Sequence, residues 1–344
     1  MKPLRIVLLV HADLVPPESL RGQTVARRNR WKTEYGVRQC LRRMGHQVHV
    51  AGLLEDLSPL EEIIRTWKPH LAFNLLEEFR GEAIYDAGVV SYLEIKGIPC
   101  TGCNPRGLVL ARDKAASKHL VAGEGVQVPP FAVFPRGKPI RVPPGRPYPI
   151  IVKSRTEEAS LGISQASIVH NAGALRRRVR FVHARLATDA VAEQYIGGRE
   201  FYVGVLGEGR GGARARVLPP LELRFGRLPG RARAIASEHA KHSLTFQKRW
   251  KVSLRVARDL PGHVRARLAR AGRTAYEALG LSGYARMDFR LDSEGRLFFL
   301  EANPNPEIAR GEEMARAAAA AGLSYQALLA RILRLALADS PAVA

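Results

Sequence analysis

Four polar side chains near the end of the chain have the types and the spacing for chemistry on a charged substrate. They lie in two segments of alternating polar and apolar residues, 284–291 and 296–303, and are Arg286, Asp288, Glu301 and Asn303. Because side chains alternate along a strand, a hairpin of these segments places all four on one face. Two facing carboxylates repel each other unless a cation lies between them, and such oxygen ligands suit Mg²⁺ shared with phosphate groups. The spacing alone equally allows a ladder of surface salt bridges.

The turn between the two segments, Asp292-Ser-Glu-Gly295, has four residues and sets the predicted register. The predicted pairs are Leu291 with Arg296, Asp288 with Phe299, and Arg286 with Glu301. The opposite, apolar face then consists of Met287, Phe289, Leu291, Phe298 and Leu300. The polar side chains are therefore expected to converge at one end of a sheet.

Two lysines stand where a regular element meets a polar segment. Lys114 follows Arg112-Asp113 at the start of a helix, and Lys153 ends an apolar strand directly before the polar turn 154–162. A lysine is a compact point charge suited to phosphate, and the N–H groups of the turn can also face phosphate. Taken alone, each lysine is better explained as a solvated surface residue.

Residues 193–200 leave a predicted strand and pass through two glycines to a second carboxylate. The backbone of such a hinge can bond to the edge of an adenine ring. Its carboxylates, Glu193 and Glu200, can accept hydrogen bonds from an amino group and a ribose hydroxyl. As an isolated string, the segment does not specify a nucleotide site.

The first third of the chain alternates strands and helices. Strands are predicted at 5–10, 47–51 and 71–75, and helices at 33–44 and 60–67. Strands joined by helical crossovers form a parallel sheet. Residues 1–104 are therefore predicted to be an N-terminal α/β domain.

The remaining residues predict mixed α+β structure. Between 105 and 200 the expected elements are helices 108–122 and 172–183 and strands 149–153, 164–169 and 190–194. Between 201 and 344 they are strands from 201, helix 263–279, the hairpin, and helices 311–321 and 324–338. The predicted fold class is α/β and α+β, with domains at 1–104, 105–200 and 201–344.

The composition is that of a globular protein with a strongly basic surface. The 344 residues are 46% apolar and 25% charged, which excludes a disordered chain and allows two or three domains. The net charge of +22 divides into +2, +9 and +11 over the three predicted domains. No named nucleic-acid motif accompanies it, so we expect a solvated basic surface or a groove for a polyanion such as ATP, and no nucleic-acid partner.

Cysteines and apolar runs bear on location. Cys40, Cys100 and Cys103 are odd in number, so no disulfide framework is predicted, and the last two lack the second ligand pair of a metal knuckle. No uninterrupted apolar window reaches ~18 residues, and the first apolar run is too short for a signal peptide. A cytoplasmic protein without a membrane partner is predicted.

Together, and in this order, the motifs resemble the D-alanine–D-alanine ligase family of the ATP-grasp superfamily, from about residue 71 to the end. The stretches that carry the resemblance are 97–102, 112–114, 149–153, 159–162, 192–201, 283–303 and 322–329. The resemblance implies a three-domain ATP-grasp enzyme that phosphorylates a carboxylate with ATP and joins it to an amine. It also implies ATP and two Mg²⁺ ions (or Mn²⁺) as cofactors and small amino acids or peptides as substrates. A homodimer is a further expectation.

Position by position, the resemblance implies a role for each candidate residue. For the nucleotide these are Lys114 and Lys153 on the phosphates, Ser160 in the loop covering them, Glu193, Gln194 and Ile196 at adenine, and Glu200 at ribose. For the metal they are Asp288 and Glu301 on one Mg²⁺, and Glu301 and Asn303 on the other. For catalysis they are Arg286 on the acyl-phosphate and tetrahedral intermediate, Lys241 on the transferred phosphate, and Glu18 on the first substrate's amino group.

The chain departs from the family where the second substrate binds. After Asn303 the family has a Pro-Gly pair and then a serine for the second alanine's carboxylate. Here Glu307 replaces the glycine and Glu312 falls near the serine's place. Either Arg310 neutralises one of them, or the acceptor carries an amine or hydroxyl there. We therefore expect free D-Ala to be a poor acceptor and a larger or cationic amine to be a better one.

Other functions remain open from the sequence. The chain could ligate a different amino acid, peptide or other carboxylate. From another class, it could be a basic nucleic-acid-binding protein with a degenerate ATP-grasp fold. The intact Lys153, Asp288, Glu301 and Asn303 argue against the latter.

Overall fold

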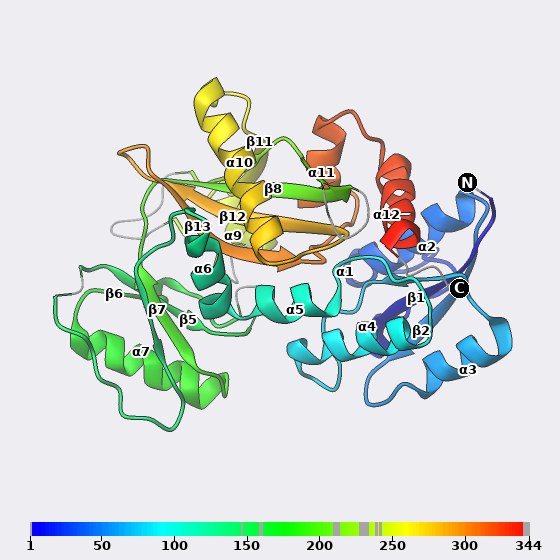
Figure 1. Ribbon diagram of the computed structural model, residues 1–344, viewed down its shortest axis with the longest axis horizontal. Helices are drawn as coiled ribbons and strands as arrows, with labels where there is room; N and C mark the ends of the chain where they lie inside the picture. Colours follow the sequence, from blue (N-terminus) through cyan, green and yellow to red (C-terminus); the bar gives the residue numbers. More distant parts are fainter. Residues whose placement is uncertain are drawn as a thin grey trace.

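The computed structural model describes residues 2–145, 147–157, 161–208, 214–226, 234–237, 240 and 243–339. These residues form three sheets. Figure 1 shows the first sheet, in blue, at one end of the molecule and the second, in green, at the other, with the third spanning the upper part. Within the described residues, no helix is long and apolar enough to cross a membrane.

The first sheet is parallel and has the strand order β2-β1-β3. Its region contains β1 (Arg5–His11), α1 (Val25–Arg30), α2 (Lys32–Arg43), β2 (Gln47–Leu53), α3 (Ser58–Trp67), β3 (Leu71–Asn74) and α4 (Asp86–Ile95). The predicted parallel α/β arrangement is confirmed, and α1 and α4 are additional helices. Gly45 follows α2 with φ +87°, the left-handed conformation that favours glycine after a helix.

The second sheet is antiparallel, in the order β4-β7-β5-β6. Its elements are β4 (Phe131–Phe134), β5 (Ile150–Ser154), β6 (Ile168–Val169), α7 (Ala172–Arg185) and β7 (Ala190–Gln194). The predicted strand 164–169 is wrong over most of its length, because residues 165–167 form a 3₁₀ turn. In this turn the Ser167 hydroxyl accepts a hydrogen bond from the Ser164 N–H at 3.1 Å, a local bond that competes with strand pairing.

The third sheet has the order β11-β10-β8-β12-β13, with β9 paired to β8. Its strands are β8 (Arg199–Glu208), β9 (Arg214–Val217), β10 (Leu221–Arg224), β11 (Ser253–Val256), β12 (Tyr284–Leu291) and β13 (Leu297–Pro304). The helices are α9 (Leu244–Arg249), α10 (Gly262–Ala278), α11 (Glu313–Ala320) and α12 (Tyr325–Asp339). Leu268 of α10 packs on one face, and Met314 of α11 and Leu329 of α12 join a core that extends to the first sheet.

The single helix predicted at 108–122 is instead two helices, α5 (Pro105–Arg112) and α6 (Lys114–Gly123). Asp113 has extended dihedral angles, and its carboxylate accepts hydrogen bonds from two N–H groups of α6. An aspartate in this position caps the second helix and interrupts the first. Both helices pack in the core of the third sheet, through Leu108 and Val121. The division into domains at 104 and 200 stays a prediction.

The hairpin of β12 and β13 has a different register from the predicted one. The predicted pairs, including Asp288 with Phe299 and Arg286 with Glu301, are wrong: Leu291 lies opposite Leu297, Asp288 opposite Glu301, and Arg286 opposite Asn303. The longer turn moves the register by one residue, and a β-bulge at Leu300 moves it by another. Together the two shifts move the pairing by two residues at Glu301 and Asn303. These side chains therefore keep their predicted face, and the predicted polar face is confirmed.

The apolar face of this hairpin is correspondingly changed. Phe299 and Ala302, rather than Phe298 and Leu300, join Met287 and Phe289 in the core. A change of register by one residue exchanges the two faces of a strand. Leu300 is therefore left on the side of the sheet that faces a cavity.

Candidate active site

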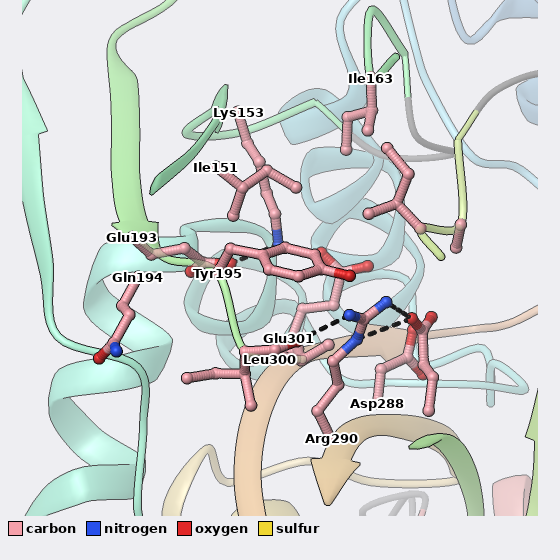
Figure 2. A pocket seen from close by; sticks show the side chains of 14 residues that line it. Ile151, Lys153, Ile163, Glu193, Gln194, Tyr195, Asp288, Arg290, Leu300 and Glu301 are labelled. Atoms are coloured by element: carbon pink, nitrogen blue, oxygen red, sulfur yellow. Dashed lines mark hydrogen bonds and ion pairs between the residues drawn. The ribbon is translucent and has the colours of Figure 1, made fainter. Parts of the chain in front are cut away.

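A cavity lies between the second and third sheets. Figure 2 shows its walls, which come from β5, β7 and the segment after β7 on one side and from β12 and β13 on the other. The predicted site residues that line it are Lys153, Glu193, Gln194, Ile196, Glu200, Asp288 and Glu301. Small-molecule sites are concave and combine apolar walls with a few convergent polar groups, and the lining of this cavity fits that description.

One part of this cavity is an apolar slot. It is lined by Ile151, Ile163, Ile196 and Leu300, with the ring of Tyr195 beside them (Figure 2). The bulge in β13 brings Leu300 here. The slot suits a flat nucleobase, although two of the predicted backbone contacts already have partners: the Gln194 N–H donates to Pro130, and the Ile196 carbonyl accepts from Arg290.

Glu193 lies between two lysines at the inner end of the cavity. Its carboxylate is 2.6 Å from the Lys153 Nζ and 3.2 Å from the Lys118 Nζ, and all three side chains are buried. Burial alone would raise the pKa of Glu193, but the two lysine charges outweigh it and hold the pKa below its usual value. Lys118 is missing from the sequence prediction, although it follows Lys114 by one helical turn. It also donates to the Leu300 carbonyl.

Glu200 is held by Arg290, a second residue that the sequence reasoning missed. Arg290 donates to one Glu200 oxygen from Nη2 at 2.5 Å and from Nε at 3.1 Å, while the Tyr202 hydroxyl donates to the other oxygen at 3.1 Å. The buried guanidinium also lies over the Tyr195 ring, 5.1 Å from its centre. The predicted ribose ligand is thus fixed in position by an arginine that lines the cavity.

The polar face of the hairpin gathers the predicted metal ligands. Arg286 donates to both oxygens of Asp288, at 2.8 and 3.0 Å, and the Asn303 amide donates to Asp288 at 3.3 Å. Glu301 lies 3.9 Å from the Lys114 Nζ. The predicted convergence of these side chains is confirmed, with Arg286 and Asp288 buried and Glu301 and Asn303 half-buried.

The donor set fits a magnesium ion that binds together with phosphates. The described residues contain no group of three His, Cys, Asp or Glu side chains able to hold a metal. Asp288, Glu301 and the amide oxygen of Asn303 instead supply two carboxylates and a neutral oxygen. Mg²⁺ is usually held by one or two carboxylates plus substrate phosphates, so an incomplete protein shell is what such a site requires.

A second cavity continues from the first toward the predicted phosphate loop. It is lined by Lys114, Lys153, Ser154, Glu157, Glu301 and Asn303, among others. The Lys114 Nζ donates to the Glu157 carbonyl at 2.5 Å, which ties the start of α6 to the polar turn. Two lysines therefore face the same space as the metal ligands.

Comparison with known proteins decides the family. The model described as "D-ala D-ala ligase C-terminus" matches residues 120–334. The D-alanine–D-alanine ligase of Oleidesulfovibrio alaskensis is 30% identical over 304 residues, covering 88% of this chain and 90% of that protein. The chain belongs to the D-alanine–D-alanine ligase family. It is an ATP-dependent ligase that forms carbon–nitrogen bonds.

Solved structures share the fold of this ligase. A D-alanine–D-alanine ligase from Bacillus anthracis complexed with ATP has a TM-score of 0.72 at 21% identity and covers 97% of both chains. The VanG D-Ala:D-Ser ligase from Enterococcus faecalis has a TM-score of 0.72 at 18% identity, over 97% of this chain and 100% of that one. The predicted ATP-grasp architecture is confirmed.

Two predicted residues of the ligase, Glu18 and Arg286, line neither cavity in the described part of the chain. Ser160 and Lys241 lie outside the described residues. Glu18 has a 75% exposed side chain and pairs with Arg38 and Arg42 of α2, at 3.1 and 2.7 Å. Its role at the first substrate stays a prediction.

Glu307 and Glu312, the carboxylates predicted near the acceptor, share one lysine as an ion-pair partner. The Lys32 Nζ lies 3.0 Å from Glu307 and also binds Glu312, and the Thr33 hydroxyl donates to Glu307 at 2.9 Å. Arg310, the alternative predicted to neutralise one of them, instead lies with its guanidinium 4.3 Å from the centre of the Tyr325 ring. The sequence offered no signal for Lys32.

Glu34 adds a third carboxylate beside this pair. Its side chain is only 6% exposed. The pKa of Glu34 is raised to about 7, chiefly by burial and also by the negative charge of Glu307, while a backbone hydrogen bond and the charge of Lys32 oppose the rise. Lys32, Glu34, Glu307 and Glu312 are called the α2 cluster below.

Proposed function

We propose that this ligase uses ATP to phosphorylate the carboxylate of a small amino acid or peptide and then joins the acyl group to an amine. The observation that carries the proposal is the continuous space in which an apolar slot, two lysines and an oxygen donor set follow one another. D-Alanine, which the relatives' names contain, is the first candidate for the activated substrate. Because the reaction consumes ATP, we also infer that the enzyme works in the cytoplasm.

The nucleotide is proposed to lie along this space from the slot to the polar turn. The base packs against Ile151 and Leu300, and the ribose approaches Glu200, which Arg290 holds in place. The phosphates meet Lys153 and Lys114. Since Glu193 keeps Lys153 charged and directed into the cavity, the phosphate site is organised before the nucleotide binds.

Asp288 and Glu301 are proposed to hold one Mg²⁺, and Glu301 and Asn303 a second, with Mn²⁺ as an alternative. When bound, the ions neutralise the phosphate charge. Arg286 keeps Asp288 oriented through two hydrogen bonds, so this ligand does not have to be rearranged when ATP arrives.

The chemistry follows in two steps. A carboxylate oxygen of the first substrate attacks the γ-phosphorus of ATP, the bond to ADP breaks, and an acyl phosphate forms. The unprotonated amine of the second substrate then attacks the acyl carbon; phosphate leaves, and the amine loses a proton. Arg286, fixed by Asp288 and lying 3.5 Å from Glu313, is proposed to stabilise the negative charge that develops on the acyl oxygen. Lys241, Ser160 and Glu18 keep their predicted roles.

The proposal is tested by ADP release with Mg·ATP and a panel of D- and L-amino acids, singly and in pairs, with product masses determined. We expect ADP release that depends on an amino acid and a product whose mass is that of its two components less one water. If no amino acid or peptide increases ADP release although Mg·ATP binds, the substrate class is wrong.

A further inference from the structure

Lys118 lies behind the apolar slot and joins two of its walls. It belongs to α6, its side chain is fully buried, and it lines neither cavity in the described part of the chain. Its Nζ lies 3.2 Å from the Glu193 Oε2 and donates a hydrogen bond to the Leu300 carbonyl. Glu193 is in β7 and Leu300 in β13, and both line the slot. Lys118 therefore connects the second sheet to the third without entering the space for a ligand.

The position of the Lys118 ammonium is fixed by the bulge in β13. At the bulge the ladder with β12 leaves Leu300 without a partner residue on that strand. The Leu300 carbonyl accepts a hydrogen bond from the buried Lys118 ammonium, and backbone groups inside a protein need such partners. The same ammonium lies 6.0 Å from the centre of the Phe299 ring, which is part of the core. The ammonium group thus has a defined place from which to act on Glu193.

The Glu193 carboxylate is held at both of its oxygens. Oε1 lies 2.6 Å from the Lys153 Nζ, a pair that Figure 2 shows at the cavity wall, and Oε2 lies 3.2 Å from the Lys118 Nζ. The side chain is 1% exposed, and Oε2 accepts no hydrogen bond from any residue that the structure describes. A buried oxygen of a cavity wall with this capacity left points to a ligand that carries an N–H donor.

A charged carboxylate accepts hydrogen bonds and cannot donate them. It attracts a purine that has an amino group at position 6, as in adenine, and repels one that has an oxo group there. Burial raises the pKa of Glu193, but the two lysines outweigh burial and keep the group charged. Because the lysines come from different elements, β5 and α6, they also oppose each other's pull on the carboxylate. Without Lys118, the carboxylate would turn toward Lys153 and away from the base.

We propose that Lys118 is a positioning residue that sets the preference of the nucleotide site for adenine over a 6-oxopurine. Lys118 does not touch the base and acts through the carboxylate of Glu193. The proposal rests on the proposed function, because it takes the nucleotide to lie in this cavity.

Calorimetric titrations of the full chain with Mg·ATP and with the magnesium complex of inosine triphosphate (ITP) test this proposal. The bases of the two nucleotides differ in having an amino or an oxo group at position 6. We expect the wild type to bind Mg·ATP about thirtyfold more tightly, the ratio expected for one hydrogen bond to a charged group, and Lys118→Met to lower this ratio about tenfold. A purely structural loss would weaken both nucleotides alike and leave the ratio unchanged.

Three further variants sharpen the test. Lys118→Gln keeps a donor for the Leu300 carbonyl without the charge, so it should lower the ratio even if Lys118→Met does not fold. In a Glu193→Gln background Lys118→Met should not change the ratio, because the acceptor that it positions is already lost. Lys96→Met, at an exposed lysine after α4, is the control and should keep the wild-type ratio.

Equal wild-type affinity for the two nucleotides overturns the proposal. So does a wild-type ratio in the folded Lys118 variants, or a further fall in the ratio when Lys118→Met is added to Glu193→Gln. Failure of the wild type to bind Mg·ATP at all would instead refute the proposed function.

Discussion

The nucleotide cavity and the α2 cluster differ in how their carboxylates are paired with cations. In the cavity each has a cationic partner: Glu193 lies between two lysines, Glu200 is bound by Arg290, and Asp288 by Arg286. In the α2 cluster Lys32 pairs with Glu307 and Glu312, which are about a third exposed, and the buried Glu34 pairs with no described side chain. An uncompensated charge is expensive to bury. The carboxylates of the nucleotide cavity are therefore paired with cations before a ligand binds, whereas those of the α2 cluster are not fully paired.

This difference indicates which part of the ligase is free to vary. ATP brings the same phosphate charges to any ligase that uses it, so the residues that receive those charges are constrained. The acceptor differs between ligases of this fold, as the D-Ala:D-Ser name of one structural neighbour illustrates. The α2 cluster contains the two carboxylates that we predict near the acceptor, and the following changes separate the two regions.

Glu301→Gln is expected to have the largest effect. Its charge serves the proposed metal site rather than the fold, so we expect turnover to fall about 10³-fold, the order seen when one preorganised electrostatic partner is lost. ADP release and Tm are measured together. Wild-type turnover would remove Glu301 from the metal site, and a variant that fails to fold would make its role structural.

Lys118→Met tests whether the cavity depends on paired charges. Lys118 is fully buried against Glu193, so its loss should lower the free energy of unfolding by about 4 kcal/mol. Arg65→Met, which breaks the exposed Arg65–Glu62 pair, is the control and should cost less than about 0.5 kcal/mol. Both are measured by urea unfolding. Equal costs for the two variants would contradict the comparison.

Glu34→Gln should raise the free energy of unfolding at high pH, whereas Lys118→Met should lower it. The folded protein holds the Glu34 proton up to about pH 7, whereas the unfolded chain loses it near pH 4.5, the ordinary pKa of a glutamate. Stability from this group is therefore complete below about pH 4.5 and is lost as the pH rises to 7. At pH 8 the variant should be more stable than wild type by about 3 kcal/mol, and near pH 4 the difference should vanish. Destabilisation at pH 8 would show that Glu34 has a cationic partner.

Arg290→Lys should have the smallest effect, and that effect should be confined to the binding of the nucleotide. Lysine cannot reproduce the paired hydrogen bonds to Glu200, so the KM for ATP should rise roughly tenfold with little change in kcat. Steady-state ADP release at varied ATP measures both. A change in the KM of the amino acid alone would place Arg290 outside the nucleotide site.

Much of the fold could be predicted because its boundaries are marked locally. Pro59 lies in the first turn of α3, and Gly45 follows α2. The register of the hairpin could not be predicted, because Phe298, Phe299 and Leu300 are all apolar and alternation does not show which of them faces the core. Only the pairing of β12 with β13 and its bulge decide that.

The residues of the candidate site were likewise predictable only in part. Arg290 continues the alternation of Arg286 and Asp288, so its place in the cavity was readable from the sequence. Lys32 was not, because its contact with Glu312 joins residues 280 positions apart and depends on how α2 packs against the segment after β13. Local pattern identifies side chains on one strand or helix, and only tertiary packing brings distant charges together.

The most direct test of the contrast between the two regions is D-alanyl-D-alanine formation, followed by ADP release and product mass with Mg·ATP and D-Ala alone. We predict that D-Ala is a poor acceptor, with a KM well above ~1 mM, the upper end of ordinary values, and that D-lysinamide added to D-Ala increases ADP release and enters the product. Efficient D-alanyl-D-alanine formation with an acceptor KM of ~1 mM or lower would contradict this account. It would show that Glu307 and Glu312 do not face the carboxylate of the acceptor.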